Sequence, residues 1–276
     1  MSHRRRLVQL AFALLAGLGP VSFGPSLLAA APKTAPDPEV VLRRARAAYV
    51  GLAEKGFQRY HFFATPDWSA LLAEQAKENP AGYDAAMKIF SKVRFEVLVG
   101  AQGDAQVSHN IVDTPNQQST AGLNQVYGGM EQILTGFFQT WTPFMLQTPF
   151  PPVGHAVKVE DAGTHYRVNW DEEGNTKVEL LMDKTFIITD MKVQSPAFDS
   201  TIRPTFDRKP DGLVLTGYYA EYQVKANASS MRLKVLIKNQ SLQGLPLPAA
   251  LDLSVWNGGN KQQITMAFSE MTLEKK

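Results

Sequence analysis

Residues 231–238 read Met-Arg-Leu-Lys-Val-Leu-Ile-Lys, and this stretch decides the fold class. Its odd-numbered residues are all apolar, whereas three of its four even-numbered residues are Arg or Lys. Because successive side chains of a β-strand point to opposite faces, the alternation predicts a strand with one buried face and one face in water. Residues 251–256 alternate in the same way.

Similar short segments recur from His155 to the end of the chain, separated by turn-forming residues such as Pro210-Asp211-Gly212. No helical pattern lies between them, so we expect neighbouring strands to pair antiparallel as a meander. Earlier strands bring the count to eleven or twelve, more than an open sheet usually holds without curling. The predicted fold is α+β: a strongly curved antiparallel sheet of about eleven strands, an incomplete β-barrel whose concave face is covered by helices. The predicted strands are 57–64, 94–100, 105–112, 156–160, 164–170, 176–182, 185–194, 201–207, 213–224, 231–238, 250–256 and 262–273.

The last of these strands changes face along its length. Ile264, Met266 and Phe268 lie on one side by their spacing, whereas Met271 and Leu273 fall on the other. One extra residue in a strand produces such a switch, so we expect a β-bulge near residues 269–270.

Helical periodicity predicts two helical regions in the first third of the chain. The first runs from Pro38 to about Lys55, with Asp37 as its cap and Pro38 at its first position. The second covers about residues 67–93 and is interrupted at Asn79-Pro80, because the residue before a proline is disfavoured in the helical conformation.

A third helix is predicted from Leu123 to Met145, ending near Pro143, within residues 114–157, where Glu131 is the only charge. Its apolar stripe is rich in methionine and aromatic residues, which repack easily around irregular guests. Gly128, Gly129 and Gly136 each weaken a helix by about 1 kcal/mol relative to alanine. The segment therefore suits either a permanent plug of the core or a movable lid over an apolar cavity.

The N-terminus has the features of a secretory signal: Arg4-Arg5-Arg6, an apolar run from Leu7 to Leu18, and small residues at 29–31. The apolar run is shorter than the ~20 residues that span a membrane. We expect residues 1–31 to be a signal peptide, with an uncleaved anchor as the alternative, and the protein to be exported to a bacterial periplasm. Residues 32–276 are expected to form a single domain.

Charge and composition exclude several classes of function. The chain has 28 basic and 26 acidic residues, and subtracting the three arginines of residues 1–31 leaves 25 against 26, a balance of −1. Such a chain lacks the basic footprint of a nucleic-acid-binding protein. It also contains no cysteine, which removes disulfides, thiolate metal sites and thiol nucleophiles.

Motifs of catalysis are missing from the sequence. There is no H-E-x-x-H metal motif, no G-x-S-x-G nucleophile turn and no P-loop, and His61, His109, His155 and His165 are scattered over separate segments. We therefore predict no metal, no cofactor and no enzymatic activity. An esterase-like hydrolase that uses His165 or His109 is the minor alternative.

The order of elements resembles the periplasmic lipoprotein-carrier superfamily, the LolA/LolB-like proteins. The local likeness lies in residues 211–217, in Leu245-Pro246-Leu247-Pro248 before residues 251–256, and in residues 263–269 after a glycine turn. The resemblance implies an incomplete β-barrel whose apolar concave face, closed by helices, shelters the acyl chains of lipoproteins. Such members use an arginine near the lid; Arg59 and Arg94 both fit that description here, and neither is assigned.

The predicted function is a non-enzymatic periplasmic carrier or sensor for acyl chains of lipids or lipoproteins, with transient partner proteins in the inner or outer membrane. The alternative is an envelope module for protein–protein interaction whose core is filled by its own side chains. The predicted ligand-binding residues are Met130, Leu134, Phe137, Phe138, Trp141 and Phe144 on the helix, and Leu233, Val235, Ile264, Met266 and Phe268 on the strands.

Overall fold

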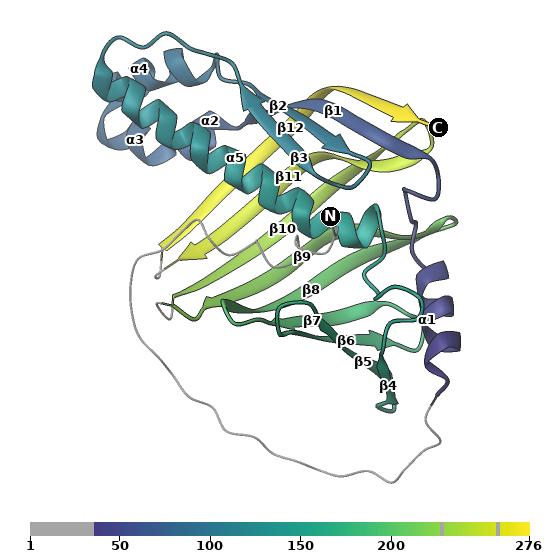
Figure 1. The fold of residues 1–276 in the computed structure, drawn as a ribbon. Coiled ribbons are helices and arrows are strands. Elements are labelled where there is room, and N and C mark those ends of the chain that lie inside the picture. Colours follow the sequence, from purple (N-terminus) through teal and green to yellow (C-terminus); the bar gives the residue numbers. More distant parts are fainter. Residues whose placement is uncertain (1–35, 227–228, 258–259) are drawn as a thin grey trace. The chain divides into compact units, whose positions relative to one another are not determined.

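The computed structural model describes residues 36–226, 229–257 and 260–276 (Figure 1). The predicted signal peptide, residues 1–31, lies outside them. Within the described residues the chain is α+β, with five helices and twelve strands. The helices are α1 (Pro38–Ala47), α2 (Trp68–Leu71), α3 (Ala73–Glu78), α4 (Pro80–Phe90) and α5 (Gln117–Met145). The strands are β1 (Phe57–Pro66), β2 (Phe95–Gly100), β3 (Ala105–His109), β4 (Lys158–Asp161), β5 (His165–Glu172), β6 (Thr176–Asp183), β7 (Ile188–Gln194), β8 (Phe198–Lys209), β9 (Gly212–Val224), β10 (Ser230–Leu242), β11 (Leu245–Asn257) and β12 (Asn260–Lys275).

All twelve strands belong to one sheet, in the order β3-β2-β1-β12-β11-β10-β9-β8-β7-β6-β5-β4. The order from β4 to β12 follows the chain, as expected for a meander, and β1 pairs antiparallel with β12. The sheet is not closed into a barrel, because β3 and β4 stand at opposite ends of this order.

The first helix is shorter than predicted. The Asp37 side chain caps α1 by accepting hydrogen bonds from the N–H groups of Glu39 and Val40, and Pro38 is the first residue of the helix, as expected. The helix ends at Ala47 rather than near Lys55, because the following chain pairs with β9: the Leu213 backbone N–H donates to the Ala48 carbonyl at 2.8 Å. Tertiary pairing thus overrides the local helical pattern.

The second helical region is interrupted at Asn79, as predicted, with Asn79 capping α4 and Pro80 opening it. The predicted start of the third helix was wrong by six residues, since α5 begins at Gln117 rather than Leu123. Asn116 caps α5 by accepting a hydrogen bond from the Ser119 N–H at 2.9 Å.

Of two further expectations about strands, one is confirmed and one is not. The predicted bulge near residues 269–270 is confirmed: the β1–β12 register shifts between the His61 and Phe63 pairs, and Glu270 has a positive φ of 51°. In contrast, β11 begins at Leu245, so Pro246 and Pro248 lie inside the strand instead of leading into it. Proline is tolerated at the beginning of a strand, where few ladder donors are lost.

The chain divides into two compact units. Unit 1 comprises residues up to Val50 together with Thr148–Lys234 and Val255–Lys261, and unit 2 comprises Gly51–Gln147, Val235–Ser254 and Gln262–Lys276. Compactness does not establish independent folding, so the expectation of a single domain for residues 32–276 stays a prediction.

Unit 1 contains α1 and strands β4–β9. Alternate residues of these strands, such as Val168, Leu180 and Met191, are buried and form its core. Tyr49, just after α1, packs edge-on against the rings of Phe150 and Phe206. The opposite face of β4–β8 carries charged side chains, so the strands separate an apolar side from a polar one.

Unit 2 contains β1–β3, α2–α5 and the greater part of β10–β12. Its core is aromatic: Tyr60, Phe62 and Phe95 are completely buried. The Tyr60 hydroxyl donates to the Pro248 carbonyl on β11 at 2.6 Å. Helix α5, the segment singled out by the sequence, lies against β3 (Figure 1).

Candidate functional site

The candidate site is built around α5. Its apolar stripe is buried over the length of the helix, and all six residues predicted there are at most 6% exposed. On the same helix Asn124, Gln125 and Gln132 are exposed, whereas Thr140 and Thr142 are buried. These six are Met130, Leu134, Phe137, Phe138, Trp141 and Phe144.

The centre of the site is a cluster of rings that joins α5 to β1 and β12. Phe62 stacks on Phe268 with ring centroids 4.2 Å apart, and Phe138 lies 5.8 Å from the Phe62 ring. Phe138 also meets Phe137 and Trp141 edge-on, at 4.8 and 5.6 Å. The side chains of α5 therefore occupy the apolar surface of these strands themselves.

The structure places four of the five predicted strand residues in unit 2. Val235, Ile264, Met266 and Phe268 are all buried. Leu233 belongs to unit 1 and is only half-buried. Of this set, Phe268 is joined to the helix residues through the Phe62 ring, which sequence reasoning did not single out although it lies in the aromatic segment 57–64.

The C-terminal end of α5 is fixed by backbone hydrogen bonds. The Leu52 N–H donates to the Met145 carbonyl at 2.9 Å, and the next residue pair repeats the bond at 3.0 Å. The Thr142 hydroxyl also donates to the carbonyl of Gly103, in the turn between β2 and β3, at 3.2 Å. Pro143 lies in this last turn and cannot donate a helical hydrogen bond.

The middle of α5 is held by a different set of contacts. The His109 ring of β3 stacks on Tyr127 with centroids 3.5 Å apart, and the Tyr127 hydroxyl donates to the Asn110 carbonyl at 3.0 Å. Burial raises the pKa of Tyr127, so this hydroxyl keeps its proton. Glu131 lies 3.6 Å from His109 Nε2. The sequence pointed to this attachment only through Glu131, the single charged residue in residues 114–157. The residues around Glu131 in the sequence did not identify His109 as its partner.

Three glycines of α5 have room for a side chain. A Cβ added at Gly122, Gly128 or Gly129 would meet nothing within 4 Å. Glycine is often kept in a helix because another element approaches closely, and that reason does not apply to these positions. Their effect is to weaken the helix, by about 1 kcal/mol each relative to alanine.

Trp141 carries an unusual polar group. Its side chain is fully buried, and its indole Nε1–H has no hydrogen-bond partner among the described residues. A buried donor without a partner costs about 1–3 kcal/mol. The N–H is therefore available to an acceptor that enters the site.

The histidines named as catalytic alternatives have structural neighbours. His165 Nδ1 lies 2.9 Å from the Thr164 hydroxyl, and the His109 ring stacks on Tyr127 of α5. Three or more His, Asp or Glu side chains do not converge as a metal site anywhere in the described ranges.

None of the helices in those same ranges combines the length and apolar character that crossing a membrane requires.

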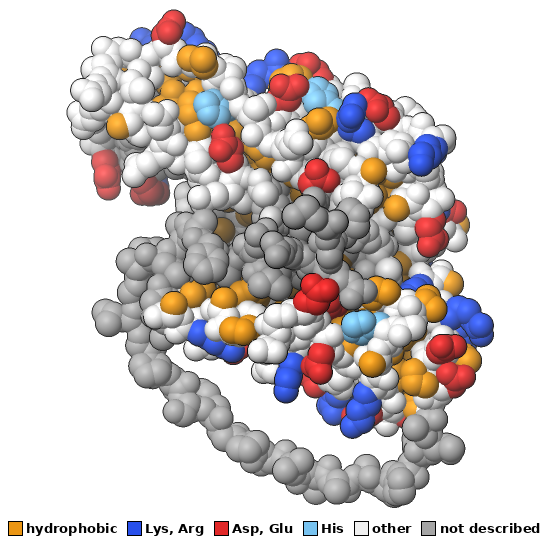
Figure 2. Space-filling view, viewed as in Figure 1, with side chains coloured by type: hydrophobic (Ala, Val, Ile, Leu, Met, Phe, Trp, Pro, Cys, Tyr) orange, Lys and Arg blue, Asp and Glu red, His pale blue; other side chains and the backbone are white. Residues whose placement is uncertain are grey.

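The two arginines considered for a lid contact both form surface ion pairs in unit 2. Arg59 lies 3.2 Å from Glu274, and Arg94 lies 2.5 Å from Glu270 with its guanidinium over the Phe63 ring. Acidic and basic side chains are interspersed in the same manner on the face shown in Figure 2.

Comparison with models of known protein families, with curated proteins and with solved structures found no match to this chain.

Proposed function

We propose that this protein is a non-enzymatic carrier or sensor that binds the acyl chains of lipids or lipoproteins in an apolar groove under α5. The observation that carries the proposal is the way α5 is attached. Its C-terminal turn is fixed by backbone bonds at Leu52, whereas the rest is held by side-chain contacts. A helix held in this way can swing about its fixed end without breaking the strand ladder beneath it.

The energetics suit exchange between helix and cargo. Each CH₂ transferred from water to an apolar site contributes about 0.8 kcal/mol, so a sixteen-carbon chain gains about 12 kcal/mol before costs. If that chain takes the place of Phe137, Phe138 and Trp141, the lost packing of these rings offsets much of the gain. Cargo bound with a small net free energy can be handed to another binder.

The unpartnered Trp141 N–H gives the groove a polar contact. An acyl ester or fatty acid carries an oxygen acceptor at one end of its hydrocarbon chain. Donation from Trp141 Nε1 to that oxygen would satisfy the buried donor and would fix the position of the chain along the groove.

The finer features of the predicted fold are part of the same proposal. We infer that the twelve-stranded sheet is strongly curved, with its apolar face concave and covered by helices, as in a LolA-like half-barrel. We also propose export to the periplasm through the signal peptide at residues 1–31, and exchange of cargo with transient partners in the inner or outer membrane.

The test is lipid occupancy. The full chain is expressed in a bacterial host, purified, and its co-purified lipids are measured by mass spectrometry. We expect acyl lipid in the parent, reduced occupancy in Trp141→Phe, which removes the N–H together with one of the two fused rings, and loss in the double variant Phe137→Glu/Trp141→Glu. Ile111→Glu is the matched control, since Ile111 is 91% exposed.

Circular dichroism and thermal melting show whether each variant is folded. Absence of lipid from the parent contradicts the proposal, as does unchanged occupancy in the folded double variant. If the double variant does not fold, the comparison of Trp141→Phe with the parent decides, because this change keeps an uncharged aromatic ring in the core.

The packing of the site favours one alternative function, an envelope module for protein–protein interaction with a self-filled core. The stacked rings of Phe62, Phe138 and Phe268 already fill the apolar surface beneath α5. In that case the free edge of β4 would recruit a partner strand. Cross-linking of a partner at Glu160, in a protein that carries no lipid, would support this function over the carrier.

A further inference from the structure

The polar face of unit 1 contains a pocket of about 610 Å³ that the acyl-binding proposal does not use. Its size is typical of small-molecule sites. Residues of β5, β6 and β7 form its floor, and Ala156 and Val157, just before β4, form part of its wall. Six polar side chains of the floor matter here: Asn169, Asp171, Lys177, Glu179, Lys192 and Gln194.

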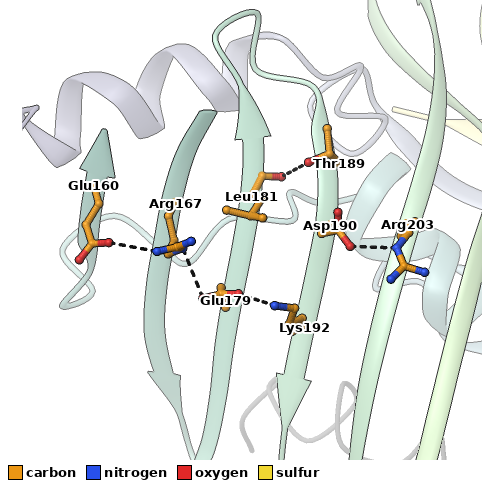
Figure 3. A network of polar contacts seen from close by, with 8 residues as sticks. All are labelled: Glu160, Arg167, Glu179, Leu181, Thr189, Asp190, Lys192 and Arg203. Atoms are coloured by element: carbon orange, nitrogen blue, oxygen red, sulfur yellow. Dashed lines mark hydrogen bonds and ion pairs between the residues drawn. The ribbon is translucent and has the colours of Figure 1, made fainter. Parts of the chain in front are cut away.

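Most charges on this face neutralise one another, as Figure 3 shows. Arg167 lies 3.6 Å from Glu160 and 3.5 Å from Glu179, and Glu179 lies 2.8 Å from Lys192. On the next strand pair Asp190 binds Arg203 at 3.0 Å. The charged side chains of this face form a network of cross-strand ion pairs.

Two charges inside the pocket depart from this pattern. Asp171 of β5 and Lys177 of β6 are direct partners in the strand register, and both side chains are exposed. Neither forms an ion pair with any described residue. A cation and an anion thus stand next to each other in a pocket, and neither has an opposite charge within 4.0 Å among the described residues.

Two amides flank these charges. Gln194 is the register partner of Lys177 on β7, and Asn169 lies two residues before Asp171 on β5. Neither amide side chain has a hydrogen-bond partner in the described part of the chain. Because a primary amide both donates and accepts, the pair can bind polar groups of either kind.

We propose that this pocket binds a small zwitterion, a molecule that carries an ammonium group and a carboxylate or phosphate a few atoms apart. The anionic group lies on Lys177 with Gln194 as a second donor. The ammonium group lies on Asp171 with the Asn169 carbonyl as a second acceptor. The chemistry fits an amino-acid or peptide zwitterion and a phosphoethanolamine headgroup equally.

Competition within the pocket does not prevent this binding. Asp171 and Lys177 can pair with each other in solution, but an exposed ion pair contributes little free energy. A zwitterion replaces that one contact by two charge-assisted contacts and the amide hydrogen bonds, in a recess that removes part of the ligand from water. A simple anion would instead meet the carboxylates of Asp171 and Glu179.

The experiment titrates the full chain with three probes by isothermal calorimetry and NMR: glycerophosphoethanolamine, the dipeptide glycylglycine, and glycerol 3-phosphate, which is an anion without an ammonium group. We expect one or both zwitterions to bind and glycerol 3-phosphate to bind at least about tenfold more weakly. The zwitterion that binds more tightly identifies the source of the ligand.

Variants test the two charges separately. Lys177→Gln and Asp171→Asn should each weaken zwitterion binding by about tenfold, because hydrogen bonds to charged groups are strong. Lys234→Gln, at an exposed lysine on β10 outside the pocket, should leave it unchanged.

Absence of binding by both zwitterions, equal binding of glycerol 3-phosphate, or binding that survives either pocket variant overturns the proposal. These surface substitutions leave the core intact, and thermal melting confirms folding. The outcome is independent of acyl binding, because Phe137→Glu/Trp141→Glu alters residues of unit 2 and the pocket is in unit 1.

Discussion

At the scale of single residues, Gly103 shows how the turn between β2 and β3 fixes the end of α5. Gly103 has a φ of +79°, and a Cβ at this position would come within 2.2 Å of the Thr142 side chain. The same residue presents its carbonyl to the Thr142 hydroxyl. The helix end can approach the turn only because no side chain stands between them.

Gly103→Ala should therefore destabilise the protein. We expect a loss of about 1 kcal/mol from the left-handed backbone conformation and a further ~1–3 kcal/mol from overpacking against Thr142. Gly154→Ala is the matched control, since Gly154 has a φ of +80° with nothing within 4 Å of the added Cβ. Urea denaturation measures both, and equal losses in the two variants would contradict the close approach.

Asp183 provides a pH-dependent prediction. Burial, the largest contribution, raises the pKa of this carboxyl, but the hydrogen bonds from Ile187 and Thr185 together outweigh it and hold the pKa below its usual range. A depressed folded-state pKa stabilises the protein above the unfolded pKa, and the stabilisation is lost as the pH falls through the folded value.

Asp183→Asn should therefore lower the free energy of unfolding near neutral pH, and this deficit should shrink as the pH falls below about 4, where the unfolded carboxyl becomes protonated. Urea denaturation of both proteins at a series of pH values tests this. A deficit that is constant from neutral to acidic pH would show that the charge of Asp183 is not responsible.

At the scale of elements, α5 combines a well-buried face with a weakened backbone. Gly128 and Gly129 lie next to Met130, yet both have open space where a side chain would be. The helix thus gives up intrinsic stability at positions where packing does not require it. This favours a helix that leaves its place at modest cost.

Replacing Gly128 and Gly129 by alanine should stabilise the protein by about 1 kcal/mol each, through helix propensity. Under the carrier proposal the same double variant should also exchange bound lipid more slowly with vesicles. Thermal melting and a fluorescent-lipid transfer assay measure the two effects. A stabilised variant with unchanged transfer would indicate that α5 does not gate the groove.

The attachment of α5 to β3 is a second property of this element. Tyr127→Leu removes both the stack on His109 and the hydrogen bond to Asn110, which together contribute roughly 1–3 kcal/mol. Hydrogen exchange should become faster in residues 117–131 and stay unchanged around Met145, where backbone bonds to residues 52–53 persist. Uniformly faster exchange along α5 would contradict separate attachments.

At the scale of the whole molecule, one sheet is shared by two compact units. Strands β10, β11 and β12 each contribute residues to both units, so the units are continuous through three strands of the sheet. Such continuity favours cooperative unfolding. If residues 32–276 form a single domain, as predicted, both units should unfold in one transition.

Leu247→Ala tests this cooperativity. Leu247 of β11 is completely buried, and its truncation should cost about 2–5 kcal/mol. We expect one unfolding transition at a lower urea concentration, with the same midpoint for hydrogen-exchange probes in β6 of unit 1 and β1 of unit 2. Two midpoints, with only unit 2 shifted, would mean that the units fold as separate domains.

The sequence by itself determined the α+β class, the antiparallel meander, the capped start of α1, the break at Asn79-Pro80 and the bulge beside Glu270, because each follows from local periodicity or from the stereochemistry of one or two residues. It also marked the buried stripe of α5 by spacing alone.

Only the tertiary structure decided where α1 stops, that Phe62 joins Phe138 to Phe268, that His109 is the partner of Glu131, and that Asp171 and Lys177 stand unpaired in one pocket. These features depend on strand register and on contacts between residues far apart in the chain. Local sequence does not encode such distances, because the free energy that selects them comes from the packing of the folded chain as a whole.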